Sequence, residues 1–417
     1  MKKILLLLIV MVIVISMTAV FTLSSCKAAE EAAEETTEEE APAEEEAVAI
    51  SGDQSETVAL VCSAAGANDN GYNQTAINGL KQLKDEKGVE YKVVEATTDY
   101  PGTLKTLAES GYKLIFSLEY DFTALIEGVG GEKPLAEQFP DTTFVVFNAN
   151  PNLNEDGTPI HNNVISVMFN VNEASFLAGV LSVQVNENVD ILFDSSKYAF
   201  TSGTEGRKVG FIGGTQSAGI EVFSFGYAEG VNYAAAEIGV DVVYDYYSTY
   251  DAGFVDTAQG ATIAGTYYSE GANVVYCVAG SVGDGVDAKA KEVKKLSIQV
   301  DANKDNSQPG YILTSVLKNT NVPVLELGPK LLEGTLVAEG GKELSYTLAS
   351  GATGITDLSV IESAISTDAD AQAKWGEIKA YIDDISAKIK DGSIKVTNAQ
   401  IGETLDISTL SNVKLPK

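Results

Sequence analysis

Short apolar strands and amphipathic helices alternate along most of this 417-residue chain, and this alternation restricts the fold more than any other feature of the sequence. The first half predicts strands at 58–62, 91–95, 113–118 and 143–148, with helices at 73–85, 100–110 and 121–138 between them. Asn73 is a plausible N-cap for the first of these helices. Continuous apolar strands separated by helices are typical of a parallel sheet covered on both faces.

The same alternation restarts after a loop rich in Asn, Pro and Gly. It predicts a helix at 173–184, a last clear helix at 371–390, and strands at 163–169, 208–214, 241–247, 273–280 and 296–301. A chain of this length exceeds the size at which one hydrophobic core usually divides. We therefore expect an α/β fold with two lobes and a ligand cleft between them.

The N-terminal segment resembles an export signal. Lys2 and Lys3 precede an apolar run, Ile4–Phe21, which ends at Leu23-Ser24-Ser25-Cys26. The run is also long enough for a retained transmembrane helix by the ~20-residue criterion. The basic start, the small residues before Cys26 and the acidic sequence after it favour a lipoprotein signal peptide over residues 1–25, with lipidation at Cys26. The exported protein would then be anchored on the extracytoplasmic face of the cell membrane, in a periplasm or at the cell surface.

Residues 26–55 are expected to form a lipidated, acidic tether. The segment 28–47 (AAEEAAEETTEEEAPAEEEA) has no aromatic residue and cannot bury enough apolar surface to fold, although a helical stretch is possible. The whole chain has a net charge of −31. Such a chain is repelled by phosphate backbones, so we expect no nucleic-acid partner.

The cysteines and the single histidine offer little chemistry. Cys62 and Cys277 lie in apolar strands, which favours two buried thiols over a disulfide. No Cys or His spacing predicts a metal site, and we expect no metal, cofactor or catalytic residue. His161 lies in a turn-like stretch, NEDGTPIHNN, and is expected in a surface loop. A Ser-His-Asp or Cys-His enzyme would have to use this one residue.

Ligands bind at the carboxyl ends of the strands in open parallel sheets, so the residues that follow each strand are the candidates for a site. They are aromatics, amides, carboxylates and one lysine, at 63–73, 119–122, 215–227 (including Phe223, Phe225 and Tyr227), 281–285, 301 and 318. Aromatic rings stack on a flat heterocycle, at about 1–3 kcal/mol each in base stacking. Any single aromatic could instead pack in the core, and Asp301 or Lys318 alone could be a solvated loop charge. Their coincidence at strand ends in both halves favours a ligand site.

Several motifs then resemble one family in the same order along the chain. They are NDNGYNQ at 68–74, VISVMFNVNEASFLAGVLS at 164–182, FIGG with IEVFSFGYAEGV, VAGSVGDGV, and QVDANKDN with ILTSVLKN. The chain resembles the basic membrane protein (Bmp/PnrA-like) family of substrate-binding lipoproteins, which includes purine nucleoside receptors of ABC importers. The resemblance covers about residues 58–396.

The resemblance implies a type I periplasmic-binding-protein fold that holds its ligand between two lobes. Residues 56–165 and about 308–340 would form the first lobe, and residues 166–307 and about 341–417 the second. By the same resemblance, Tyr72 and Phe223 would sandwich the base, and Asn73 and Asp69 would lie near its polar edge. Asp301 and Lys318 would hold the ribose hydroxyls, and Gly283 would let the backbone approach the sugar.

The sequence departs from the family pattern in two places. Cys62-Ser63 stands where Thr-Asp is common, so Ser63 replaces a carboxylate, and Tyr72 stands where Phe is usual. Relatives bind riboflavin, another stacked heterocycle with hydroxyls. Riboflavin is therefore an alternative ligand for this chain.

The expected function is a lipid-anchored receptor that delivers a purine nucleoside to a membrane ABC permease. Two other functions remain open. One is a hydrolase with Asp69 or Asp301 as its base, and the other is a surface adhesin or antigen whose cleft is idle.

Overall fold

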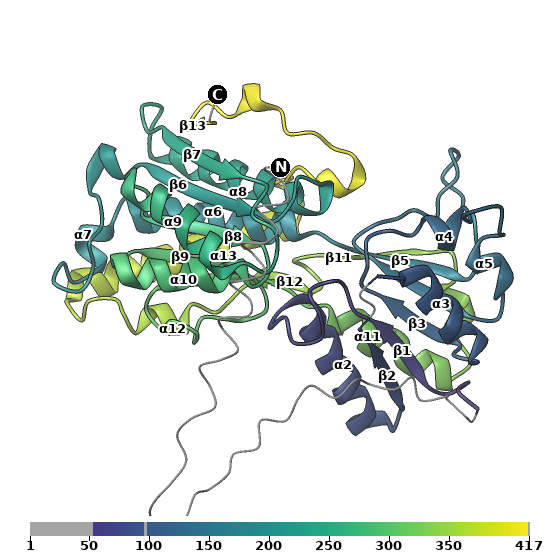
Figure 1. Cartoon of the computed structure of the whole chain (residues 1–417). Coiled ribbons are helices and arrows are strands. Elements are labelled where there is room, and N and C mark those ends of the chain that lie inside the picture. The colour runs from purple at the N-terminus through teal and green to yellow at the C-terminus, as the bar shows by residue number, and fades with distance from the viewer. Residues whose placement is uncertain (1–52, 96–97, 416–417) are drawn as a thin grey trace, which may run out of the picture. The chain divides into compact units, whose positions relative to one another are not determined.

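The computed structural model describes residues 53–95 and 98–415, and two sheets organise this part of the chain (Figure 1). The first sheet has the strand order β11-β5-β4-β3-β1-β2, and all of its neighbouring strands pair in parallel. Its strands are β1 (Val58–Val61), β2 (Tyr91–Val94), β3 (Leu114–Ser117), β4 (Thr143–Phe147), β5 (Val164–Phe169) and β11 (Glu343–Tyr346). We call this sheet and its helices the first lobe.

The second sheet has the strand order β12-β10-β9-β8-β6-β7-β13, and only β12 pairs antiparallel to its neighbour. Its strands are β6 (Lys208–Gly213), β7 (Tyr244–Thr249), β8 (Val274–Val278), β9 (Leu296–Asp301), β10 (Ile312–Lys318), β12 (Thr353–Ile355) and β13 (Val413–Lys414). We call this sheet and its helices the second lobe. The predicted α/β class, with two parallel sheets flanked by helices, is confirmed.

Helices separate most of the strands. The α-helices are α2 (Tyr72–Lys87), α3 (Tyr100–Glu109), α4 (Thr123–Ile126), α5 (Leu135–Gln138), α6 (Val171–Asn186), α7 (Val189–Leu192), α8 (Ala218–Ile238), α9 (Thr257–Ser269), α10 (Val282–Val293), α11 (Asn321–Leu332), α12 (Ser359–Glu362) and α13 (Ala369–Lys390). Short 3-10 helices are η1 (Gly203–Gly206), η2 (Leu336–Glu339), η3 (Ala399–Ile401) and η4 (Ile407–Thr409). The strands β1, β3, β4, β5 and β8 are buried along their whole length, which explains their continuous apolar runs, whereas the edge strands β2 and β11 are largely intermediate or exposed.

The chain passes between the two sheets three times in the described region. It leaves the first sheet after β5, returns to the first lobe from β10 through α11, and leaves it again between β11 and β12. The predicted division placed residues from about 308 to 340 in the first lobe and those from about 341 in the second. Strand pairing differs from that division, because β10 pairs with β9 in the second sheet and β11 pairs with β5 in the first.

Two helices pack closely because glycines lie where they meet. In α6 and α8, a methyl group at Gly226 would clash with the carbonyl oxygen of Asn172, and one at Gly230 with that of Phe176. A methyl group at Gly179 would clash with the carbonyl oxygen of Tyr227. The FLAG and FGYAEG motifs therefore include the residues that let the two helix backbones approach each other.

The predicted helix over 121–138 is wrong. The structure has two single turns there, α4 and α5, separated by Gly128, Gly130 and Gly131. All three glycines have φ between 68° and 86°, in the left-handed region that ends helices, and Pro134 precedes α5.

The expectation that Cys62 and Cys277 are buried free thiols is confirmed. The expected surface position of His161 is wrong, because the side chain is buried and its Nε2 lies 2.8 Å from the carbonyl oxygen of Ile126. Among the described residues, no helix is both long and apolar enough to cross a membrane. The predicted signal peptide, Cys26 and almost all of the tether lie outside the described residues.

Candidate ligand-binding site

Lys318, the last residue of β10, lies at the centre of an aromatic cluster formed by both lobes. Its Nζ is 5.1 Å from the ring centroid of Tyr72, 5.6 Å from that of Phe223 and 5.6 Å from that of Phe169. The residue is only 4% exposed. Burial lowers the pKa of Lys318 to about 8, and the nearby carboxylate of Asp301 opposes this shift. Among the described residues, no carboxylate oxygen lies within 4.0 Å of this ammonium group.

Tyr72 is the first residue of α2, and three contacts fix its position. Asn148 Nδ2 donates a 2.7 Å hydrogen bond to its phenolic oxygen, and Thr320 Oγ1 donates a 2.8 Å bond to its backbone carbonyl. Its ring also stacks with Tyr120, with a centroid distance of 6.2 Å and an interplanar angle of 19°. Desolvation and the neighbouring Tyr120, Asp301 and Glu119 raise the pKa of Tyr72, so its hydroxyl stays protonated.

The start of α2 is held by Asp69, and the prediction that Asn73 is the N-cap is wrong. The carboxylate of Asp69 accepts hydrogen bonds from the backbone N–H groups of Gly71, Asn73 and Gln74 at 2.8–3.0 Å. These charge-assisted bonds satisfy the N–H group of the N-cap residue Gly71 and two free N–H groups of the first helical turn. Asp69 therefore positions Tyr72, and its oxygens are engaged within the protein.

Asn73 holds the loop that follows β1. Its Oδ1 accepts from the backbone N–H of Ser63, and its Nδ2 donates to Ser63 Oγ and to the carbonyl of Gly66, all at 2.9 Å. Ser63, at the position where the family pattern has a carboxylate, thus has its hydroxyl oxygen bonded to Asn73. Both polar groups of Asn73 are engaged in shaping this loop.

Asp301, the last residue of β9, is brought close to Tyr72 across the two lobes. A methyl group on Gly71 would lie 3.5 Å from Asp301 Oδ2, in ordinary van der Waals contact. The backbone of Asp301 has φ 70°, a conformation that non-glycine residues seldom adopt and that is frequent at functional sites. Desolvation raises the pKa of Asp301, and the ammonium groups of Lys318 and Lys304 partly offset this effect.

Phe223, on the first turns of α8, is buried and faces the same lysine as Tyr72. Because Lys318 Nζ lies 5.1 Å and 5.6 Å from the two ring centroids, these centroids are no more than about 11 Å apart. A flat ring between two aromatic faces needs roughly 7 Å, which is twice the carbon–carbon contact distance. The upper bound on the centroid separation is therefore larger than this distance, and both rings lie near the same ammonium group. Tyr227 is buried in the same core cluster as Phe223, and Phe225 is partly buried against it.

Gly283, near the start of α10, is explained by packing in the second lobe. A methyl group there would lie 2.8 Å from Gln299 Nε2 and 2.9 Å from Gln299 Oε1. Gln299 Nε2 is itself fixed by a 2.6 Å hydrogen bond to Asp287. In the described part of the chain, the atoms nearest to a methyl group on Gly283 belong to Gln299 and not to Lys318, Tyr72 or Phe223. The expected place of Gly283 next to a sugar therefore stays a prediction.

Three residues near the cluster were not among the predicted site residues. Phe169 ends β5 and contacts Lys318, Asn148 follows β4 and bonds Tyr72, and Tyr120 follows β3 and stacks on Tyr72. Asn148 has φ 64° and a buried Oδ1 without a hydrogen-bond partner, and its carbonyl accepts a 3.3 Å bond from Gln400 Nε2. Position at or just after the end of a strand is the one sequence signal that these residues share.

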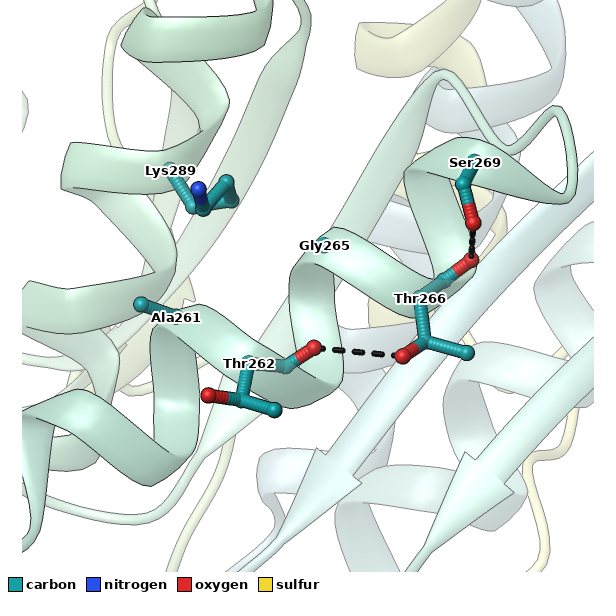
Figure 2. A pocket seen from close by; sticks show the side chains of 6 residues that line it. All are labelled: Ala261, Thr262, Gly265, Thr266, Ser269 and Lys289. Atoms are coloured by element: carbon teal, nitrogen blue, oxygen red, sulfur yellow. Dashed lines mark hydrogen bonds between the residues drawn. The ribbon is translucent and has the colours of Figure 1, made fainter.

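A separate surface hollow lies between α9 and α10 (Figure 2). It is lined by Ala261, Thr262, Gly265, Thr266 and Ser269 of α9 and by Lys289 of α10. None of these residues belongs to the aromatic cluster. Within the part of the chain that the structure describes, no group of three or more His, Cys, Asp or Glu side chains could hold a metal ion.

Two lobes with an aromatic, hydrogen-bonding cluster at their strand ends define the solute-binding-protein class. The model of the PnrA-like ABC transporter substrate-binding family, Bmp, matches residues 56–391, and the chain belongs to this family. The protein is therefore a substrate-binding protein of ABC transport. The members of this family bind substrates and do not catalyse reactions.

Relatives and solved structures agree with this assignment. The chain is 29% identical to "ABC transporter nucleoside-binding protein BmpA" of Lactococcus lactis over 76% of this chain and 84% of that protein. It is 29% identical to "CD4+ T-cell-stimulating antigen" of Listeria innocua over 82% and 87%. The crystal structure of an ABC transporter solute-binding protein from Aeropyrum pernix K1 matches with a TM-score of 0.65 at 21% identity, covering 85% of this chain and 95% of that one. This last similarity shows the fold alone.

Proposed function

We propose that the protein captures a purine nucleoside between its two lobes and delivers it to an ABC permease in the membrane. The observation that carries this proposal is the position of the buried Lys318 ammonium group, which lies 5.1 Å from the ring centroid of Tyr72 and 5.6 Å from that of Phe223. A buried cation without a close carboxylate gains from a ligand that brings oxygen acceptors. Two aromatic rings beside it suit a ligand that also brings a flat heterocycle.

Each residue then has a distinct part. Tyr72 and Phe223 stack on the base, Lys318 donates hydrogen bonds to ribose hydroxyl oxygens, and Asp301 accepts hydrogen bonds from those hydroxyls. Asp69 and Asn73 act one step away, because their polar atoms hold the start of α2 and the loop that presents Tyr72. The name of the Lactococcus lactis relative supports a nucleoside ligand.

We further propose that the protein acts outside the cytoplasm, with a lipid on Cys26 and residues 26–55 as a tether. This arrangement keeps the receptor near the permease while the lobes stay free to close on the ligand. Lobe closure by rotation about the three connecting segments would couple ligand capture to delivery. Small-angle scattering profiles of the liganded and empty protein should then differ.

The test starts with residues 50–417, purified without added ligand and then denatured, so that released small molecules can be identified by mass spectrometry. Calorimetric titration with guanosine, adenosine, inosine, free bases and riboflavin follows. Nucleoside binding that is weakened at least tenfold in both Phe223→Ala and Asp301→Asn supports the proposal. Binding of riboflavin instead of a nucleoside would leave the proposed site unchanged but would identify a different ligand. Binding of none of these compounds would overturn the proposed function.

A further inference from the structure

Tyr120 is an aromatic residue next to the site that has no role in the proposed function. It follows β3 by three positions, and its ring stacks with that of Tyr72 at 19°. Tyr72 is 7% exposed, whereas Tyr120 is 61% exposed. An exposed ring of this size beside a buried aromatic cluster is unusual for a residue that only packs in a core.

The surroundings of the Tyr120 hydroxyl show which way the side chain faces. Its pKa is raised, first by desolvation and then by the carboxylates of Asp301, Glu119 and Asp69. Asp301 belongs to the second lobe, while Tyr120 belongs to the first. A ring that is exposed, that stacks on Tyr72 and whose pKa is affected by a carboxylate of the opposite lobe lies on the side of the first lobe that faces the second.

We propose that Tyr120 is a further ligand-binding residue, and this inference rests on the proposed function. Its ring extends the stacking surface of Tyr72. Its hydroxyl points towards the ligand hydroxyls that donate hydrogen bonds to Asp301. A stacked pair of tyrosines suits a fused, flat heterocycle that carries a hydroxylated substituent. A single-ring sugar would gain little from the second ring.

Exposure also separates binding from stability at this position. Removing a ring that is mostly in solvent opens no internal cavity, so Tyr120→Ala should unfold at the same temperature as the wild type. The same substitution removes one stacked ring from the complex, for which we expect an affinity loss of about 10- to 100-fold. Tyr120→Phe should retain the stacking and lose only the part that the hydroxyl contributes.

The experiment is calorimetric titration of the wild type, Tyr120→Ala and Tyr120→Phe with the best nucleoside found for the wild type, together with melting temperatures. Tyr91→Ala is the control, because Tyr91 lies in the same sheet at the start of β2, the edge opposite the strand carboxyl ends. Weaker binding by Tyr120→Ala at an unchanged melting temperature, with normal affinity in Tyr91→Ala, supports the proposal.

Unchanged affinity in Tyr120→Ala would overturn it. Normal affinity with impaired uptake would also overturn it, because Tyr120 would then contact the permease. If the wild type binds nucleosides and only this variant result is negative, the proposed function stands. If the wild type binds no nucleoside or flavin, both proposals fail.

Discussion

Asn148 Nδ2 donates a 2.7 Å hydrogen bond to the hydroxyl of Tyr72, 76 positions away in the sequence. The bond joins the residue after β4 to the first residue of α2, and it exists only because this chain has Tyr at a position where the family pattern has Phe. Both side chains are buried, so the bond fixes the tilt of the Tyr72 ring without help from solvent.

Tyr72→Phe should therefore distinguish the contribution of the ring to ligand affinity from the contribution of the hydroxyl to stability. The substitution leaves the Asn148 amide without a partner in a buried position, so we expect the free energy of unfolding to fall by about 1–3 kcal/mol. Ligand stacking uses the ring face, so affinity should change less than threefold. Chemical denaturation and calorimetry on the same samples check this prediction, and unchanged stability would contradict it. In Asn148→Ala the amide is absent, so a second change of Tyr72→Phe should then have little effect on stability.

Ligand affinity should depend on pH through Lys318. Its pKa in the free protein is lowered to about 8 by burial. Ligand oxygens that accept from the ammonium group raise this pKa in the complex, so affinity is full below pH 8 and falls as the pH rises above it. Calorimetric titrations from pH 6 to pH 9.5 measure the dependence. Lys318→Met should bind weakly with a flat profile over that range, and a wild-type affinity that stays constant to pH 9.5 would rule out this role.

Stability should depend on pH through Asp287 in α10. Burial raises the pKa of Asp287 from 3.8 to about 7, although Ser297 and Gln299 donate hydrogen bonds to it. Because the folded state holds this proton more tightly, the contribution to stability is present below pH 4 and is lost as the pH rises through 7. Asp287→Asn should flatten this part of the stability curve.

The Asn variant can retain the local hydrogen bonds, because Gln299 Oε1 is buried without a partner and can accept from the new amide after a side-chain flip. Denaturation midpoints at pH 5 and pH 8 for the two proteins test the prediction. An equal pH dependence in wild type and variant would show that Asp287 does not cause it.

Gly230→Ala should strongly destabilise the second lobe. The new methyl group would clash with the carbonyl oxygen of Phe176 on α6, and neither helix backbone can move without disturbing the core around it. Overpacking of this kind costs about 1–3 kcal/mol or more. Gly376→Ala is the matched control, because Gly376 lies inside α13 with nothing within 4 Å of the added methyl group. That change should stabilise the helix by up to about 1 kcal/mol. Thermal melts distinguish the two outcomes.

The sequence pattern predicted the central strands because they are buried on both faces and therefore apolar along their length. It did not predict which sheet β10 and β11 join, since a buried strand looks the same in either lobe. The break in the helix over 121–138 did have a signal, the sequence GVGGEKP, in which the glycines allow left-handed φ and the proline precedes a new turn. His161 was placed at the surface because the neighbouring sequence is polar, and the contact that buries it, with Ile126, is 35 positions away.

The site could be predicted only as a set of strand ends. Tyr72, Phe223, Asp301 and Lys318 are indeed brought close together, as the topology of parallel sheets requires. Their individual roles could not be assigned from sequence, because the difference between a ligand contact and a helix cap depends on hydrogen-bond geometry. The family resemblance implies that Asp69 lies near the polar edge of the base, and in the structure its carboxylate accepts hydrogen bonds from three backbone N–H groups. Gln400 lies beyond the residues that the family model matches.

The threefold crossing between the sheets also restricts how the chain can reach its native state. The first sheet lacks strand β11 until residue 346 is available, and α2 lacks its partner α11, although the rest of that lobe ends at residue 169. Until then β5 presents an open edge of unpaired backbone groups. The first lobe therefore stays incomplete until most of the sequence of the second lobe is available to the folding chain. A chain truncated before residue 343 would be an aggregation-prone intermediate and not a smaller receptor.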